Sequence, residues 1–200
     1  MMYRVVEIFK TLQGEGYNTG KEVVFVRFAR CNLACPWCDT DHSGGRDMTA
    51  GEILEAVLAL GCGSVILTGG EPLLQAGLEN LLALLKTYSL WIGIETNGTI
   101  NPAPGERALL DYIATSPKTG SPIALQAADE VRVVAAPGVT PELCEEIRSV
   151  IRAHRYYLSP CESGGEFNIL EAISLLGALN ERTEDKWLLS IQTHKLAKIP

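Results

Sequence analysis

The sequence predicts an α/β fold in which a mainly parallel sheet forms an incomplete barrel of the (βα)6 type, with fewer helices than strands. Short apolar segments alternate with helical patterns, which is typical of parallel strands joined by right-handed crossovers. About six or seven strands are expected, too few to close an eight-stranded barrel. The stretch 116–129, rich in Pro, Gly, Ser and Ala, joins two strands without a helical pattern. Residues 1–200 are expected to form one domain, because their 46% hydrophobic content suffices for one core.

The first elements follow from periodicity and capping. A strand is predicted near Tyr3 to Phe9, and the run Val23 to Ala29 is β-branched and aromatic, as a buried strand should be. Thr49 and Glu52 form a capping-box pattern at the start of a helix that Gly61 ends. The apolar residues of that helix, at helical spacing, are Ile53, Leu54, Val57, Leu58 and Leu60.

The remaining elements repeat this alternation. Further strands are predicted at Val65 to Leu67, Trp91 to Ile94, Tyr112 to Ala114, Val131 to Val134, Tyr156 to Leu158 and Trp187 to Ile191. Further helices are predicted at Leu78 to Thr87, Pro141 to Ala153 and Ile169 to Leu179.

Charge and hydropathy exclude two classes of partner. The formal net charge is −7 and no run of three basic residues occurs, so the pattern typical of nucleic-acid binding is missing. The N-terminal segment carries charges within its apolar stretch, and no apolar run approaches the ~20 residues of a membrane span. We expect a soluble, cytoplasmic protein that binds neither nucleic acid nor membrane.

Three cysteines follow the second predicted strand, in the pattern Cys31-x3-Cys35-x2-Cys38. A four-iron four-sulfur cluster normally takes four thiolates, so a cluster held by three keeps one iron open to a small molecule. Two other interpretations stay open: a zinc site completed by His42, and a disulfide redox pair of Cys35 and Cys38. The remaining cysteines are expected to be buried free thiols; they are Cys62, Cys144 and Cys161.

A strand ending at Thr68 runs into Gly69-Gly70-Glu71-Pro72. Glycine tolerates unusual backbone angles, and Glu71 and Pro72 suit a first helical turn. Strand-end carbonyls and the Glu71 carboxylate are candidate acceptors for an ammonium group. The combination of this run with three upstream cysteines is far more specific than either part.

On these two motifs the chain resembles the radical S-adenosylmethionine superfamily. The resemblance implies that the amino and carboxylate groups of S-adenosylmethionine chelate the open iron of a 4Fe-4S cluster. It also implies an external electron donor, whose electron cleaves the sulfonium and releases a 5'-deoxyadenosyl radical. The implied cofactor contacts are Trp37, near the adenine, Gly70, and the segment Ser116, Pro117 and Lys118.

Several separate segments also resemble the 7-carboxy-7-deazaguanine synthase family within that superfamily. They are Leu12-Gln13-Gly14-Glu15-Gly16, Arg27, Cys38-Asp39-Thr40, Gln192-Thr193-His194-Lys195 and Ile199-Pro200. The resemblance implies conversion of 6-carboxy-5,6,7,8-tetrahydropterin, a small pterin substrate, to 7-carboxy-7-deazaguanine with loss of ammonia. This step leads to queuosine and related deazapurines. It further implies a requirement for Mg2+ and a homodimer.

The resemblance also assigns the substrate contacts. They are Leu12, Gln13, Gly14, Glu15, Arg27, Thr68, His194 and the terminal carboxylate of Pro200. Gln13 and Glu15 suit the amide and amine groups of a pterin edge, and Arg27 offers a planar fork for the substrate carboxylate. Thr40 supplies a hard oxygen of the kind Mg2+ binds. No side chain is assigned a catalytic role beyond the cofactor-generated radical.

Two segments do not fit simply. Ser159-Pro160-Cys161-Glu162 stands where the family has Gln-Pro followed by an acidic residue, which leaves an adenosine contact there in doubt. Glu95-Thr96-Asn97-Gly98 ends a strand, but Asn-Gly is also a turn signal, and its role stays open. The alternative function is a radical activase that makes a glycyl radical on a partner enzyme. Such an activase gives no reason for Gln13, Glu15 or the C-terminal run.

Metal content separates the cluster from a non-catalytic metal-binding module. Anaerobically purified protein is expected to contain iron and sulfide, with broad visible absorption that bleaches on reduction, because the three thiolates hold a cluster. Elemental and sulfide analysis checks this. Zinc without iron or sulfide would favour the non-catalytic module instead.

Overall fold

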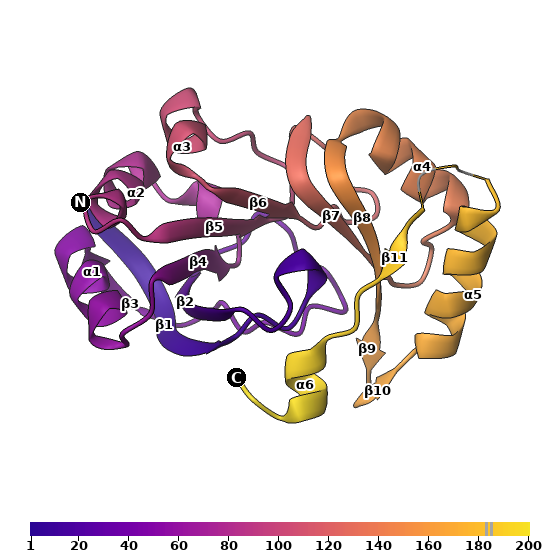
Figure 1. Ribbon diagram of the computed structural model, residues 1–200, viewed down its shortest axis with the longest axis horizontal. Coiled ribbons are helices and arrows are strands. Elements are labelled where there is room, and N and C mark those ends of the chain that lie inside the picture. Colours follow the sequence, from indigo (N-terminus) through magenta and orange to yellow (C-terminus); the bar gives the residue numbers. More distant parts are fainter. Residues whose placement is uncertain (183, 185) are drawn as a thin grey trace.

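The computed structural model describes residues 1–182, 184 and 186–200. Its main element is a nine-stranded sheet in the order β11-β8-β7-β6-β5-β4-β2-β1-β3 (Figure 1). The strands of this sheet are β1 (Met2–Leu12), β2 (Glu22–Phe28), β3 (Arg46–Thr49), β4 (Ser64–Gly69), β5 (Trp91–Thr96), β6 (Tyr112–Thr115), β7 (Ala127–Ala135), β8 (Arg152–Pro160) and β11 (Leu188–Leu189). Each neighbouring pair of strands between β11 and β2 in this order is parallel, and β1 is antiparallel to both β2 and β3.

Five helices lie along the sheet on the side away from its curved interior (Figure 1). They are α1 (Ala50–Ala59), α2 (Leu78–Lys86), α3 (Pro104–Leu109), α4 (Pro141–Val150) and α5 (Ile169–Asn180). The short helix α6 (Thr193–Ala197) belongs to the C-terminal tail and lies apart from these five (Figure 1). Short 3-10 turns occur at η1 (Gly16–Asn18) and η2 (Pro72–Leu74), and a small hairpin pairs β9 (Glu162–Ser163) with β10 (Glu166–Phe167). The described residues thus contain six α-helices and eleven strands, so the predicted partial barrel with fewer helices than strands is confirmed. The predicted number of six or seven strands is too low, because nine strands form the main sheet and two more form the small hairpin.

The sequence prediction is wrong at several boundaries. The helix predicted to reach Ala153 ends at Val150, because Arg152 and Ala153 already pair with β7. The strand predicted over Trp187 to Ile191 contracts to Leu188–Leu189. Strand β3 and helices α3 and α6 are additional elements. Each buries at most one side chain, so their sequences show no periodic apolar pattern.

The strands alternate between an outer apolar face and an inner face whose character changes along the barrel. On β7, Val131 and Val133 join the main core while Glu130 and Arg132 point the other way. The inner face is apolar at the amino ends of the strands, where a small cluster contains Val23, Phe25 and Ile66. At the carboxyl ends the inner residues are polar, as at Thr68 and Glu95. The fold therefore places polar groups at one mouth of the barrel.

Two local features support the connections. Thr49 and Glu52 form the predicted capping box at α1. The β9–β10 hairpin turns at Gly164 and Gly165, both with positive φ (63° and 85°), which glycine adopts without steric cost. No helix in the described part of the chain has the length and apolar character of a membrane span.

Helix α1 offers a matched test of packing. Leu54 is 6% exposed and packs in the core, whereas Leu58, one turn later, is 38% exposed. Leu54→Ala should lower the free energy of unfolding by about 2–4 kcal/mol, because a buried leucine loses both transfer energy and packing. Leu58→Ala should lower it by less than about 1 kcal/mol. Denaturant unfolding checks this, and equal losses would contradict the assigned packing.

Candidate active site

A cavity of about 620 Å³ opens at the carboxyl ends of the parallel strands. Ligands in α/β sheets bind at this edge. Every residue that the family resemblance assigns to the cluster, Mg2+, cofactor or substrate lines the cavity except Pro117, which is buried. The predicted residues that line it are Leu12, Gln13, Gly14, Glu15, Arg27, Cys31, Cys35, Trp37, Cys38, Thr40, Thr68, Gly70, Ser116, Lys118, His194 and Pro200.

The cysteine loop, residues 29–45 between β2 and β3, carries no helix or strand of its own. Cys31, Cys35 and Cys38 are all free, and a turn closed by a hydrogen bond from Cys38 N to Cys35 O (3.1 Å) connects the last two. Burial raises the pKa of the Cys35 thiol, Lys118 opposes that rise, and the neighbouring thiols Cys38 and Cys31 add to it. The loop thus presents three soft sulfur donors to one cavity.

These thiols fit an iron-sulfur cluster better than a single zinc ion. Zinc ligands converge on one point, and no three His, Cys, Asp or Glu side chains do so anywhere in residues 1–182, 184 and 186–200. A 4Fe-4S cluster spreads its thiolates over separate irons, as the open loop allows. The disulfide interpretation has no support here, because Cys35 and Cys38 are unpaired and no helix begins at Cys38.

Glu71 does not face the cavity, which corrects the expectation that its carboxylate serves as an acceptor for a bound ammonium group. Its side chain is fully buried and accepts hydrogen bonds from Thr96 Oγ1 (2.9 Å), Asn97 N (2.8 Å) and Leu73 N (3.1 Å). Burial raises the pKa of Glu71, and these hydrogen bonds act against the rise. The carboxylate joins the end of β4 to the end of β5.

Gly70 allows the β4 loop to approach the cysteine loop. A Cβ at Gly70 would overlap the Arg30 carbonyl, and the Glu71 amide donates to that same carbonyl at 2.9 Å. The preceding Gly69 has a φ of 127° and its Cβ would overlap the Phe28 backbone. The two glycines are therefore required by close backbone contact.

Asn97 connects the end of β5 with the cysteine loop, a role that the sequence left open. Its amide donates to Asn32 Oδ1 at 2.9 Å and lies 3.9 Å from Cys31 Sγ. The adjacent Thr96 bonds Glu71 as described. The Glu95-Thr96-Asn97 segment thus supports both the cysteine loop and the cavity wall.

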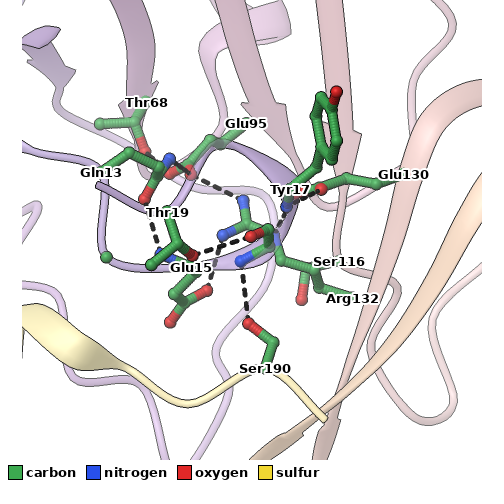
Figure 2. A network of polar contacts seen from close by, with 12 residues as sticks. Gln13, Glu15, Tyr17, Thr19, Thr68, Glu95, Ser116, Glu130, Arg132 and Ser190 are labelled. Atoms are coloured by element: carbon green, nitrogen blue, oxygen red, sulfur yellow. Dashed lines mark hydrogen bonds and ion pairs between the residues drawn. The ribbon is translucent and has the colours of Figure 1, made fainter. Parts of the chain in front are cut away.

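Five hydrogen-bonded polar residues line one side of the cavity and are called the polar floor here: Gln13, Glu15, Thr68, Glu95 and Arg132 (Figure 2). The Arg132 guanidinium donates to Glu15 (2.7 Å) and to Glu95 (2.6 Å). Glu95 also accepts from Gln13 Nε2 (3.0 Å) and Thr68 Oγ1 (2.9 Å). The predicted substrate residues Gln13, Glu15 and Thr68 therefore belong to one hydrogen-bonded network.

Lys118 and Trp37 form a second wall. Lys118 Nζ donates to Ser116 Oγ (2.7 Å) and lies 5.0 Å from the Trp37 ring centroid, within cation–π range. Burial lowers the pKa of Lys118, while Cys35 and Glu15 act in the opposite direction. The predicted segment and the predicted tryptophan are therefore adjacent.

The C-terminal tail, residues 190–200, folds back over the cavity. The amide and hydroxyl of Thr193 both donate to Gly14 O at 3.0 Å, and a Cβ at Gly14 would overlap the His194 ring. Thr11 Oγ1 donates to the backbone oxygen of Pro200 at 2.9 Å. His194 and Pro200 are thereby held beside the first predicted substrate segment.

Lys195 ties this tail to two other segments. Its ammonium pairs with Asp39, between Cys38 and Thr40, and with Glu162 of the β9–β10 hairpin. Burial alone would raise the pKa of Asp39, but the hydrogen bond and charge of Lys195 outweigh it, so that pKa lies below its usual value. The two ion pairs connect the tail, the cysteine loop and the hairpin.

At the departure from the family pattern, Ser159 is 2% exposed and does not line the cavity, whereas Pro160, Cys161 and Glu162 do. Glu162 forms an ion pair with Lys195, and the Cys161 amide donates a hydrogen bond to Asn168 Oδ1 at 2.7 Å. The structure shows Ser159 as a packed residue.

Sequence reasoning missed four residues of the site: Glu95, Asn97, Arg132 and Lys195. Glu95 and Asn97 stand in a strand-end motif whose role was open. Arg132 lies in an apolar strand, where an isolated arginine was itself a signal, since charged residues are rarely buried without partners. Lys195 stands in the C-terminal run, where its sequence context does not indicate the two carboxylates that it pairs with.

The Lys195 ion pairs are testable without any turnover. Lys195→Met should speed amide hydrogen exchange in residues 193–199 by about tenfold or more, because the tail loses two of its anchors. Lys198→Met, an exposed lysine of the same tail, is the control and should leave exchange unchanged. Because the pKa of Asp39 is lowered, the Asp39–Lys195 ion pair should stabilise the tail through neutral pH. This stabilisation should disappear as the pH falls through the lowered pKa and Asp39 gains a proton. Equal exchange in both variants would contradict the assignment.

Comparison with known proteins agrees with this geometry. Residues 25–165 match the radical SAM superfamily. The chain is 47% identical over 204 residues to 7-carboxy-7-deazaguanine synthase of Neisseria meningitidis serogroup B, covering 98% of this chain and 94% of that protein. It is 46% identical over 203 residues to 7-carboxy-7-deazaguanine synthase of Haemophilus influenzae, with the same coverage.

A solved structure shares the fold. The crystal structure of QueE from Escherichia coli superposes with a TM-score of 0.74 at 24% identity, covering 96% of this chain and 94% of that one. The curated relatives give no support to the radical activase alternative. The chain belongs to the radical SAM superfamily, whose members use a 4Fe-4S cluster and S-adenosylmethionine, and within it to the 7-carboxy-7-deazaguanine synthase family.

Proposed function

We propose that this protein converts 6-carboxy-5,6,7,8-tetrahydropterin to 7-carboxy-7-deazaguanine, with loss of ammonia, in the cavity at the carboxyl ends of its parallel strands. One observation carries the proposal. Three thiols and polar residues from segments throughout the chain, from Gln13 to Lys195, line the same cavity. A cavity of about 620 Å³ lies within the usual size range for small-molecule sites.

Cys31, Cys35 and Cys38 would hold the cluster. When bound, the cluster supplies an electron to the sulfonium of S-adenosylmethionine, and this produces the radical that starts the reaction. Trp37, Gly70, Ser116 and Lys118 are the proposed cofactor contacts, supported by their place in the cavity wall. Pro117 does not line the wall, so we propose that it acts by fixing the backbone between its two neighbours.

The substrate would lie between the polar floor and the tail. Gln13, Glu15 and Thr68 present hydrogen-bonding groups for the pterin edge. Leu12, Gly14, His194 and Pro200 complete the proposed contacts, supported by the close packing of the tail on the first segment.

Arg27 is the proposed partner of the substrate carboxylate. It lines the cavity and pairs with Glu7 through Nε at 2.6 Å. No partner is found for its two terminal nitrogens among the described residues, so both can donate hydrogen bonds to a carboxylate.

Three further parts of the proposal rest mainly on family resemblance. Thr40 would contribute an oxygen to Mg2+, and it lines the cavity next to the cluster ligand Cys38. An external donor would supply the electron. Two identical subunits would assemble, which light scattering can test, and a cytoplasmic location is supported by composition alone.

The proposed reaction is tested directly. Anaerobically reconstituted protein, supplied with the tetrahydropterin, S-adenosylmethionine, Mg2+ and a reductant, should form 7-carboxy-7-deazaguanine and ammonia, identified by mass spectrometry. Omission of S-adenosylmethionine is the control. Cleavage of the cofactor without the deazaguanine product would overturn the proposed substrate while leaving the radical chemistry intact.

The magnesium proposal predicts a specific response at Thr40. Thr40→Val removes the hydroxyl and keeps the shape, so half-maximal activity should require at least about tenfold more Mg2+, as expected when a metal contact is lost. Thr40→Ser keeps the oxygen and should retain most of the response. Identical Mg2+ titrations for the wild type and both variants would show that Thr40 is not a metal contact.

A further inference from the structure

Arg132 lies on β7 with one carboxylate against each guanidinium nitrogen (Figure 2). Nη1 pairs with Glu15 at 2.7 Å, Nη2 with Glu95 at 2.6 Å, and Nε faces Glu130 at 3.1 Å without hydrogen-bond alignment. Arg132 as a residue is only 5% exposed, so its guanidinium is almost completely shielded from water. One cation thus serves three acidic groups.

A contribution to the stability of the fold does not explain why one buried arginine pairs with three carboxylates. Taking several charges out of water costs more than their mutual attraction reliably returns. Three carboxylates on one guanidinium also leave a formal excess of two negative charges. Groups of this kind are concentrated at functional sites.

The three carboxylates are not equivalent. Glu15 and Glu95 line the cavity, whereas Glu130 does not. Glu130 accepts from Tyr17 N (2.8 Å) and Tyr112 Oη (2.9 Å), and so joins the η1 loop to β6 and β7. Two acidic groups therefore face the substrate space, and one holds the arginine from behind.

Arg132 itself is unsuited to binding a substrate anion. Each of its nitrogens already faces a carboxylate, in contrast to Arg27, whose terminal nitrogens have no partner in the part of the chain that the structure describes. Any influence of Arg132 on the substrate therefore passes through Glu15 and Glu95. The planar fork reaches both of them at once, which a lysine ammonium cannot do in the same geometry.

We propose that Arg132 is a positioning residue that holds the carboxylates of Glu15 and Glu95 side by side as paired acceptors for the N–H groups of the pterin ring. This inference rests on the proposed substrate. The second donors on Glu95, from Gln13 and Thr68, complete the orientation of that carboxylate. Glu130 anchors the guanidinium on the side away from the cavity.

The charges around Glu95 give the proposal a pH signature. Burial alone would raise the pKa of Glu95, but the charge and hydrogen bond of Arg132, with Gln13 and Thr68, outweigh it and lower that pKa. The other charged groups facing this network are Glu15, Glu130 and, from the far wall, Lys118. Without the fork, burial dominates and Glu95 gains a proton at higher pH.

Arg132→Lys is the decisive variant. We expect kcat/KM to fall about 10²-fold, as for a small misplacement of binding groups, with a higher KM carrying much of the loss. The acidic limb of the kcat/KM profile should move to higher pH by about one unit or more, because Glu95 loses its strongest stabilising partner. Equilibrium binding of the tetrahydropterin, measured without reductant, should weaken in parallel.

The matched control is Arg155→Lys on the neighbouring strand β8. Arg155 pairs in register with Glu130, does not line the cavity, and stacks over Tyr17 at 3.7 Å. It should keep kcat/KM within about twofold and its pH profile unchanged. A pH profile and KM for Arg132→Lys equal to those of the wild type would overturn the proposal, as would an identical shift in both variants.

A second variant covers the case in which Arg132→Lys does not fold. Glu130→Gln keeps both inner carboxylates paired and weakens only the outer anchor, so the expected fall in kcat/KM is about tenfold, again with a raised KM. Unchanged kinetics in this variant would overturn the anchoring role. Failure of the wild type to bind the pterin or form product would overturn the proposed function instead, so the two failures are distinguishable.

Discussion

The common direction of seven strands is the constraint on which this active site depends. Because β2, β4, β5, β6, β7, β8 and β11 run in parallel, all of their carboxyl ends meet at one edge. Residues that are distant along the chain therefore meet there without a special connection. The cysteine loop follows the first of these strands, and the tail follows the last.

The ends of neighbouring strands are fastened to one another by buried polar groups. Glu71 joins the β4 and β5 ends, and Asn97 extends the connection to the cysteine loop. Backbone polar groups at strand ends lack ladder partners, and an unpaired buried group is costly. The fully buried carboxylate supplies those partners, so a residue of the glycine-rich run works as internal support for the cavity wall.

Charge is arranged unevenly around the cavity. The floor carries Glu15 and Glu95 held by Arg132, while Arg27 and Lys118 stand on the walls. A substrate with both N–H donors and a carboxylate has complementary groups at each place. The tail then lies over the remaining side, fastened by Lys195 to Asp39 and Glu162. The site is thus enclosed by segments from both halves of the chain.

The sequence predicted the periodic elements well and the aperiodic ones poorly. Strand β2 and helix α1 have strong apolar patterns or caps, so their existence followed from local rules. Strand β3 and helix α3 bury one side chain or none and left no such pattern. The helix predicted through Ala153 was too long because pairing with β7 captured the last residues as strand. Tertiary pairing overrode local propensity there.

By itself, the sequence determined the groups that are available: three thiols at fixed spacing, a glycine-rich strand end, and polar side chains at the positions that the family resemblance assigns to the substrate. These features depend only on residues that are near one another in the sequence, so they can be recognised without knowledge of the fold. Only the tertiary structure decided which acidic groups face the cavity. Glu15 and Arg132 are 117 residues apart, and Lys195 and Asp39 are 156 apart. Such pairs depend on strand order and register, which no local pattern encodes. For this reason only the structure shows that Glu71 supports the cavity wall from inside and that Arg132 belongs to the site.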